Sequence, residues 1–224
     1  MLKGIVFDAY GTLFDVFSVA QKCEKEYPGR GDEISQIWRQ KQLEYSWLQT
    51  LMGQYKQFWN ITEDALCYAL KSLELFYNED NIKSLMDSYY NLTVYSDVEE
   101  ALQKFRPRKL VILTNGNAEM FDHLLVNTGM NQYLDGFLSA DTVKLFKPRP
   151  EVYQIAVDYL GINKNEILFV SSNAWDIAGA KSFGFSTGWI NRAHKPCEQL
   201  GVQPDYIVSS LLELAQKMEK ENFL

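Results

Sequence analysis

Residues 3–13, KGIVFDAYGTL, carry an apolar run that ends in a single carboxylate, Asp8, just before a glycine turn. In an open α/β sheet, the chemistry lies where parallel strands end and turns begin. The residue two positions beyond Asp8 is Tyr10, so the second acid that a phosphate-transferring enzyme would place there is missing. The stretch therefore predicts a first strand whose end carries a functional carboxylate without an acidic partner.

Length and composition predict one globular unit with room for an insertion, since the chain has 224 residues and is 46% hydrophobic. A formal net charge of −7 argues against nucleic acid and anionic membranes as partners, because both need a basic patch. No apolar run approaches the roughly 18 residues of a membrane span. The three cysteines lack a CxxC pair and predict neither a disulfide framework nor a zinc site. We expect a cytoplasmic protein.

Hydrophobic periodicity predicts strands that alternate with helices, which specifies an α/β fold with a doubly wound, Rossmann-like parallel sheet. Short apolar runs that end in polar or glycine turns predict strands at residues 3–7, 109–113, 166–170, 186–190 and 206–208. Apolar residues spaced three and four apart predict helices at 118–128, 151–160, 176–183 and 211–221.

Residues 16–92 break this alternation, because they contain no convincing strand and their apolar pattern predicts four helices. We predict a core made of residues 1–15 and 93–224, with residues 16–92 inserted as a helical cap. The insertion follows the first strand directly, so the cap should lie over the sheet edge that carries Asp8.

Polar residues follow three further segments, and each has an ordinary structural explanation. Thr114 and Asn115 precede a glycine, as in an anion cradle but also as in a common helix cap. Lys147 precedes a proline in what could be a solvated loop, and Asp176 could be a plain N-terminal helix charge. The topology nevertheless brings all these residues and Asp8 to one edge of one sheet. It is improbable that the ordinary explanation holds for all four segments at once.

In this order, the four segments resemble the four motifs of the haloacid dehalogenase superfamily: the aspartate nucleophile, the Ser or Thr, the Lys and the terminal acidic loop. The Asp-Ala-Tyr form of the first motif resembles the L-2-haloacid dehalogenases rather than the phosphatases. Stretches similar to that family are residues 29–35, 38–45 and 47–48 in the predicted cap, and 169–176 and 189–192 in the core.

The resemblance implies hydrolytic dehalogenation of short L-2-haloalkanoic acids. Asp8 would attack C2 and release halide, and water would then attack the ester carbonyl, so that one inversion gives a D-2-hydroxy acid. Lys147 is the candidate cation that keeps Asp8 ionised, and Asp176 the candidate base that activates the water. The resemblance also places Ser171, Asn173 and Tyr153 in this network, although core packing explains Tyr153 equally well.

Further site residues are also implied by the resemblance. Arg39 in the cap and Asn115 would receive the departing halide, although a solvated helix position explains Arg39 from composition alone. The Thr114 hydroxyl, where the family usually has serine, would hold the substrate carboxylate. Predicted substrate-pocket walls are Tyr10, Gln40, Leu43, Phe58 and Trp175, of which Leu43, Phe58 and Trp175 could instead be cap packing.

We predict no metal and no cofactor. Magnesium-dependent relatives carry acids at the positions of Tyr10 and beside Ser172, and Mg²⁺ needs several carboxylate or carbonyl oxygens. Two alternatives are a metal-dependent small-molecule phosphatase of the same fold and a non-catalytic binding protein on this scaffold. We expect cap aromatics such as Trp47 and Trp59 to be exposed, which favours a homodimer, as the family resemblance also implies.

Overall fold

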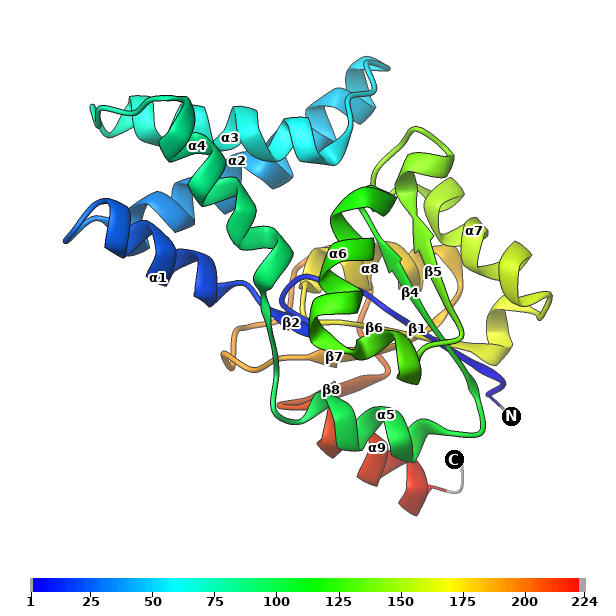
Figure 1. The fold of residues 1–224 in the computed structure, drawn as a ribbon. Helices are drawn as coiled ribbons and strands as arrows, with labels where there is room; N and C mark the ends of the chain where they lie inside the picture. Colours follow the sequence, from blue (N-terminus) through cyan, green and yellow to red (C-terminus); the bar gives the residue numbers. More distant parts are fainter. Residues whose placement is uncertain (1, 222–224) are drawn as a thin grey trace.

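The computed structural model describes residues 2–221 and contains a parallel six-stranded sheet with the order β5-β4-β1-β6-β7-β8 (Figure 1). Its central strands are buried on both faces and consist almost entirely of aliphatic and aromatic residues, as is usual in parallel sheets. The strands are β1 (Gly4–Phe7), β4 (Lys109–Thr114), β5 (Gly136–Ser139), β6 (Ile167–Ser171), β7 (Ser186–Ile190) and β8 (Tyr206–Val208).

Helices cover both faces of this sheet, which confirms the predicted doubly wound α/β fold. Two of them, α5 and α9, pack together below the strands in Figure 1, while α7 and α8 pack together above them. The bounds are α5 (Val98–Phe105), α6 (Ala118–Thr128), α7 (Pro150–Leu160), α8 (Ala174–Phe183) and α9 (Leu211–Lys220).

Two elements of the core are absent from the sequence-based prediction, the helix α5 and the strand β5. The strand β5 pairs with β4 and forms one edge of the sheet. It matters for the site because the loop that follows it, through the short 3-10 helix η3 (Ala140–Thr142), delivers Lys147 to the carboxyl edge.

Between the first and second strands of the main sheet, the chain forms a separate layer of packed helices (Figure 1). These are α1 (Phe17–Glu26), α2 (Gly31–Met52), α3 (Phe58–Ser72), α4 (Glu79–Met86) and the 3-10 helix η1 (Asp87–Asn91). The chain leaves the core through β2 (Phe14–Asp15) and returns through β3 (Thr93–Val94), and these two strands pair antiparallel as a short ribbon. The predicted bounds of the cap, residues 16–92, stay a prediction. They lie directly between the two strands of this ribbon.

No helix within residues 2–221 is long and apolar enough to cross a membrane. The cap aromatics that we expected to be exposed are half-buried instead, because Trp47 packs against Trp175 and Trp59 stacks on Tyr90. They therefore provide no argument for a homodimer. Large apolar side chains that are exposed on the cap helices and loops are Phe17, Leu48, Leu51, Met52, Tyr68 and Phe76.

Candidate active site

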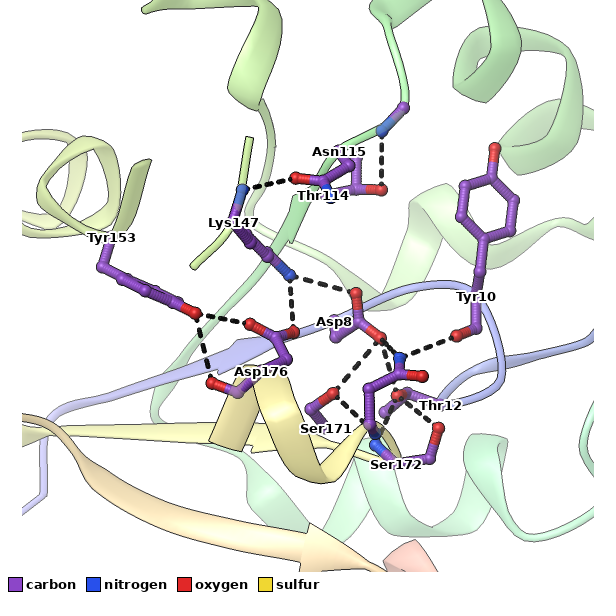
Figure 2. A network of polar contacts seen from close by, with 12 residues as sticks. Asp8, Tyr10, Thr12, Thr114, Asn115, Lys147, Tyr153, Ser171, Ser172 and Asp176 are labelled. Carbon is purple, nitrogen blue, oxygen red and sulfur yellow. Dashed lines mark hydrogen bonds and ion pairs between the residues drawn. The ribbon is translucent and has the colours of Figure 1, made fainter. Parts of the chain in front are cut away.

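The polar residues predicted to meet at the carboxyl edge of the sheet do meet there (Figure 2). Asp8 follows β1 directly, Ser171 ends β6, and Asp176 lies in the first turn of α8. Their side chains converge on one another, and Lys147 enters from the loop after β5. Segments far apart in the sequence thus form one polar cluster.

Lys147 bridges the two carboxylates of this cluster. Its Nζ donates to Asp8 Oδ1 at 3.0 Å and to Asp176 Oδ2 at 2.9 Å. Asp8 is 7% exposed, Lys147 1% and Asp176 0%, so water screens these charges poorly. The ammonium is thereby held in one position between the carboxylates of Asp8 and Asp176.

Burial and neighbouring charge shift the pKa values of Asp176 and Lys147. Burial raises the pKa of the Asp176 carboxyl to about 6; the Asp8 charge adds to the rise, while Lys147 and the Tyr153 hydroxyl oppose it. Burial lowers the pKa of the Lys147 ammonium, but the charges of Asp176 and Asp8 outweigh burial and raise this pKa above its ordinary value. At neutral pH, Lys147 is therefore charged and Asp176 is an ionised base.

Tyr153 lies behind Asp176 and has two functions in the structure. Its hydroxyl donates to Asp176 Oδ1 at 2.7 Å, and its ring packs among buried phenylalanines such as Phe169 and Phe185. The close approach of the ring requires Gly179 in α8, because a Cβ there would lie 2.5 Å from the Tyr153 hydroxyl oxygen. Packing and hydrogen bonding, which we weighed as alternatives, are both present.

The second oxygen of Asp8, Oδ2, accepts three side-chain hydrogen bonds. The donors are Asn173 Nδ2 at 2.9 Å, Thr12 Oγ1 at 3.0 Å and Ser171 Oγ at 3.3 Å. Together with Lys147, they fix both carboxylate oxygens. The carboxylate is therefore held in one orientation.

Thr12 is a site residue that the sequence analysis missed. Its hydroxyl also accepts the backbone N–H of Ser172 at 2.8 Å, so it ties the first loop to the acidic loop. The turn that allows this contact contains Gly11 at a φ of +83°, where a Cβ would also lie 3.0 Å from Ser172 Oγ. The sequence signal that could have identified Thr12 is a hydroxyl side chain four residues after Asp8, in the same tight turn.

Arg39 reaches the site from the cap helix α2. Its Nη2 donates to Asn173 Oδ1 at 2.9 Å, and the same amide holds Asp8 through its Nδ2. Asn115 uses its side-chain oxygen to accept the backbone N–H of Lys147 at 2.9 Å, and the Thr114 hydroxyl accepts the N–H of Gly116 at 3.1 Å. The roles of Arg39, Thr114 and Asn115 toward halide and substrate stay predictions.

Aromatic side chains surround the cluster on the cap side. The Tyr10 ring points away from the carboxylates in Figure 2, and it packs with Phe58, Tyr89 and Phe121. Its hydroxyl is buried without a hydrogen-bond partner, and burial raises its pKa well above the ordinary value.

The other predicted wall residues differ in their positions. Trp175 contacts Trp47 of the cap with ring centroids 5.4 Å apart, so it lies at the contact between cap and core. Leu43 is half-buried, whereas Gln40 is exposed. The predicted contribution of Gln40 to a substrate wall therefore has no burial to support it.

Residues 2–221 contain no group of three or more His, Cys, Asp or Glu side chains placed to hold a metal ion. The space between Asp8 and Asp176 holds the Lys147 ammonium, which would repel a divalent cation there. Tyr10 and Ser172 supply no carboxylate oxygens at the neighbouring positions. These donors do not fit Mg²⁺.

Comparisons with known proteins agree with this geometry. A family model described as haloacid dehalogenase-like hydrolase matches residues 2–184. The chain belongs to this family. Within the dehalogenase family, it is 46% identical over 215 residues to an (S)-2-haloacid dehalogenase of Pseudomonas sp. (strain CBS-3), a match that covers 95% of this chain and 94% of the relative.

Solved structures of the family superpose closely on this chain. The L-2-haloacid dehalogenase of Xanthobacter autotrophicus gives a TM-score of 0.94 at 40% sequence identity, with 98% of this chain and 99% of the relative covered. A second structure of that enzyme, with chloropropionic acid covalently bound, gives a TM-score of 0.92 at the same identity and coverage.

Proposed function

We propose that this dehalogenase-family chain hydrolyses the carbon–halogen bond of short L-2-haloalkanoic acids to give D-2-hydroxy acids and halide. The observation that carries the proposal is the Lys147 ammonium between Asp8 and Asp176. That arrangement provides an ionised nucleophile and a separate base. Further support comes from a relative of the same fold that holds chloropropionic acid covalently.

In the first step, a carboxylate oxygen of Asp8 forms a bond to C2 of the substrate, and the bonding pair of the carbon–halogen bond leaves with the halide. The attack is in line, so C2 inverts. Arg39 enters from the cap and carries a positive charge that can receive the halide. The Thr114 hydroxyl and nearby N–H groups would hold the substrate carboxylate.

In the second step, water attacks the Asp8 carbonyl carbon of the ester, and Asp176 takes its proton. The bond between that carbon and the bridging ester oxygen, which came from Asp8, then breaks. The hydroxy acid leaves with this oxygen and takes up the proton from Asp176, while the water oxygen stays in the Asp8 carboxyl group. C2 is untouched in this step, so the single inversion is kept. The Tyr153 hydroxyl, which donates to Asp176, orients the base.

Chloride release from L- and D-2-chloropropionate, each with a chelator present, tests the proposal. We expect release from the L-form alone, at a rate that the chelator does not change, because Lys147 supplies the positive charge between the carboxylates. No release from either form by folded protein would contradict the proposal. A phosphate-ester panel with Mg²⁺ and then ligand screening would follow, as tests of the phosphatase and the binding-protein alternatives.

The pH dependence of kcat is a second expected result. Asp176 must be ionised to accept a proton, and its carboxyl pKa is raised to about 6, so activity should fall as the pH falls through this region. The Asp8 charge contributes to that rise and disappears in the ester, so the midpoint in kcat should lie below pH 6.

The loss of activity at low pH should be larger in multiple turnover than in a single round of halide release. Enzyme held at low pH and then assayed at pH 7.5 should recover full activity, which excludes irreversible unfolding as the cause, and circular dichroism at the low pH should show the folded protein. A kcat that stays constant down to pH 4 would contradict the role of Asp176 as the base.

Two sequence-based predictions, a homodimer and a cytoplasmic location, belong to this proposal and rest on the resemblance and on composition. Light scattering of the purified protein tests the first.

A further inference from the structure

The segment at the end of β7, Trp189 to Arg192, has no part in the reaction described above, yet it touches both loops of the site. The indole Nε1 of Trp189 donates to the carbonyl oxygen of Ser172 in the acidic loop at 3.2 Å. Arg192 reaches the carbonyl oxygen of Thr12 in the nucleophile loop, at 3.3 Å from its Nη2. Thr12 in turn donates its hydroxyl to Asp8.

The guanidinium of Arg192 is itself held on two further sides. Its Nη1 lies 3.0 Å from Asp97 Oδ1 and its Nη2 lies 3.2 Å from Asp97 Oδ2, which is a bidentate ion pair. Its Cζ lies 4.0 Å from the centre of the Tyr95 ring, in a cation–π contact. Only 22% of the Arg192 side chain is exposed. The group is therefore fixed rather than a free surface charge.

These partners lie just after the ribbon, where the chain returns from the helical layer to the core. Tyr95 directly follows β3, its N–H donates to the carbonyl of Leu13 at 3.1 Å, and its hydroxyl donates to Asp15 of β2 at 3.3 Å. Asp97 also accepts the N–H of Leu211, which starts α9. One guanidinium thus contacts the nucleophile loop and the segment that follows β3.

We infer that Arg192 is a positioning residue for the nucleophile: it fixes the Thr12 backbone against the ribbon and so holds the Thr12 hydroxyl on Asp8. The inference rests on the proposed function. Arg192 touches no reacting atom, so its effect passes through the loop. Small displacements of a nucleophile slow chemistry strongly while binding changes little. Its influence should therefore fall on ester formation rather than on substrate affinity.

A lysine at this position could pair with Asp97 but could not supply the planar fork that reaches Thr12 and Asp97 together. Arg192→Lys keeps the charge and loses the geometry, whereas Arg192→Gln loses both. The matched control is Lys195→Gln, which removes an exposed charge three residues further along the same loop.

The test is a single-turnover measurement with enzyme in excess over L-2-chloropropionate, which follows chloride release at saturating enzyme. This rate does not depend on ester hydrolysis or on the fraction of competent enzyme. We expect Arg192→Gln to lower it by about tenfold or more, with the half-saturating enzyme concentration changed by less than about threefold. Arg192→Lys should recover part of the loss, and Lys195→Gln should match the unchanged protein.

An unchanged saturating rate in both Arg192 variants would overturn the inference. A change only in the half-saturating enzyme concentration would overturn it as well. If the Arg192 variants do not fold, Asp97→Asn replaces them, because it weakens the ion pair while an amide oxygen can still accept from Leu211. A rate loss of about twofold or more in that variant supports the inference, and no loss overturns it. Absence of chloride release from the unchanged protein would instead overturn the proposed function, and the role of Arg192 with it.

Discussion

Asp8→Asn is expected to lower the rate of chloride release from L-2-chloropropionate by about 10⁴-fold or more while the protein stays folded. The amide has nearly the shape of the carboxylate, but it is a poor nucleophile and cannot form the ester. Lys147 keeps Asp176 as a charged partner in this variant, so the buried ammonium is not left alone. Multiple-turnover assays measure the loss of chloride release, and a thermal melt of the variant tests whether it stays folded.

The matched control is Asp122→Asn, which makes the same chemical change at an exposed position on α6. It should show unchanged activity. Intact mass must establish that the substituted amide has not hydrolysed back to the acid during preparation. Near-normal turnover by an intact Asp8→Asn protein would show that Asp8 is not the nucleophile.

The carboxyl edge was predictable from the sequence, because the topology of a parallel sheet determines where strand ends meet. Lys147 lies on the loop after β5. Asp8, Thr114 and Asp176 are far apart in the chain, but each lies at or soon after the end of an apolar strand. The pairing of β1 with both β4 and β6 then brings those ends together.

Elements with weak patterns were not predicted. The strand Gly136–Ser139 has four residues, none of them β-branched, and therefore shows no period-two signal of its own. The helix α5 did carry a signal, since Val98, Ala101, Leu102 and Phe105 share one helical face and are buried. The short length of the helix, eight residues, explains how its pattern escaped notice.

Hydrogen-bond partners were the least predictable part of the site. The sequence could nominate Asn173 but not show that its two amide atoms serve Arg39 and Asp8 at once. Likewise, Thr12 and Arg192 act through a turn whose shape depends on Gly11 and on packing against distant segments. Such contacts depend on ångström-level geometry, whereas strand order depends only on pattern.

Asp176→Asn is expected to separate the two steps of the reaction. The nucleophile Asp8 keeps its contacts with Lys147 and with the donors on its second oxygen, so ester formation should continue. The water that must attack the ester lacks its base, so hydrolysis should slow by about 10²-fold or more. The variant should release a burst of one chloride per active site and then continue at the slow rate of ester hydrolysis.

Intact mass spectrometry should then show a covalent adduct of one carboxyethyl group per chain, and peptide mapping should place it on Asp8. The matched control is Asp158→Asn, at an exposed position on α7, which should turn over normally and carry no adduct. Repeated turnover by Asp176→Asn at a near-normal rate would exclude Asp176 as the base. A folded variant that releases no chloride at all would mean that Asp176 acts before the ester forms, through the charge balance that it shares with Asp8 around Lys147.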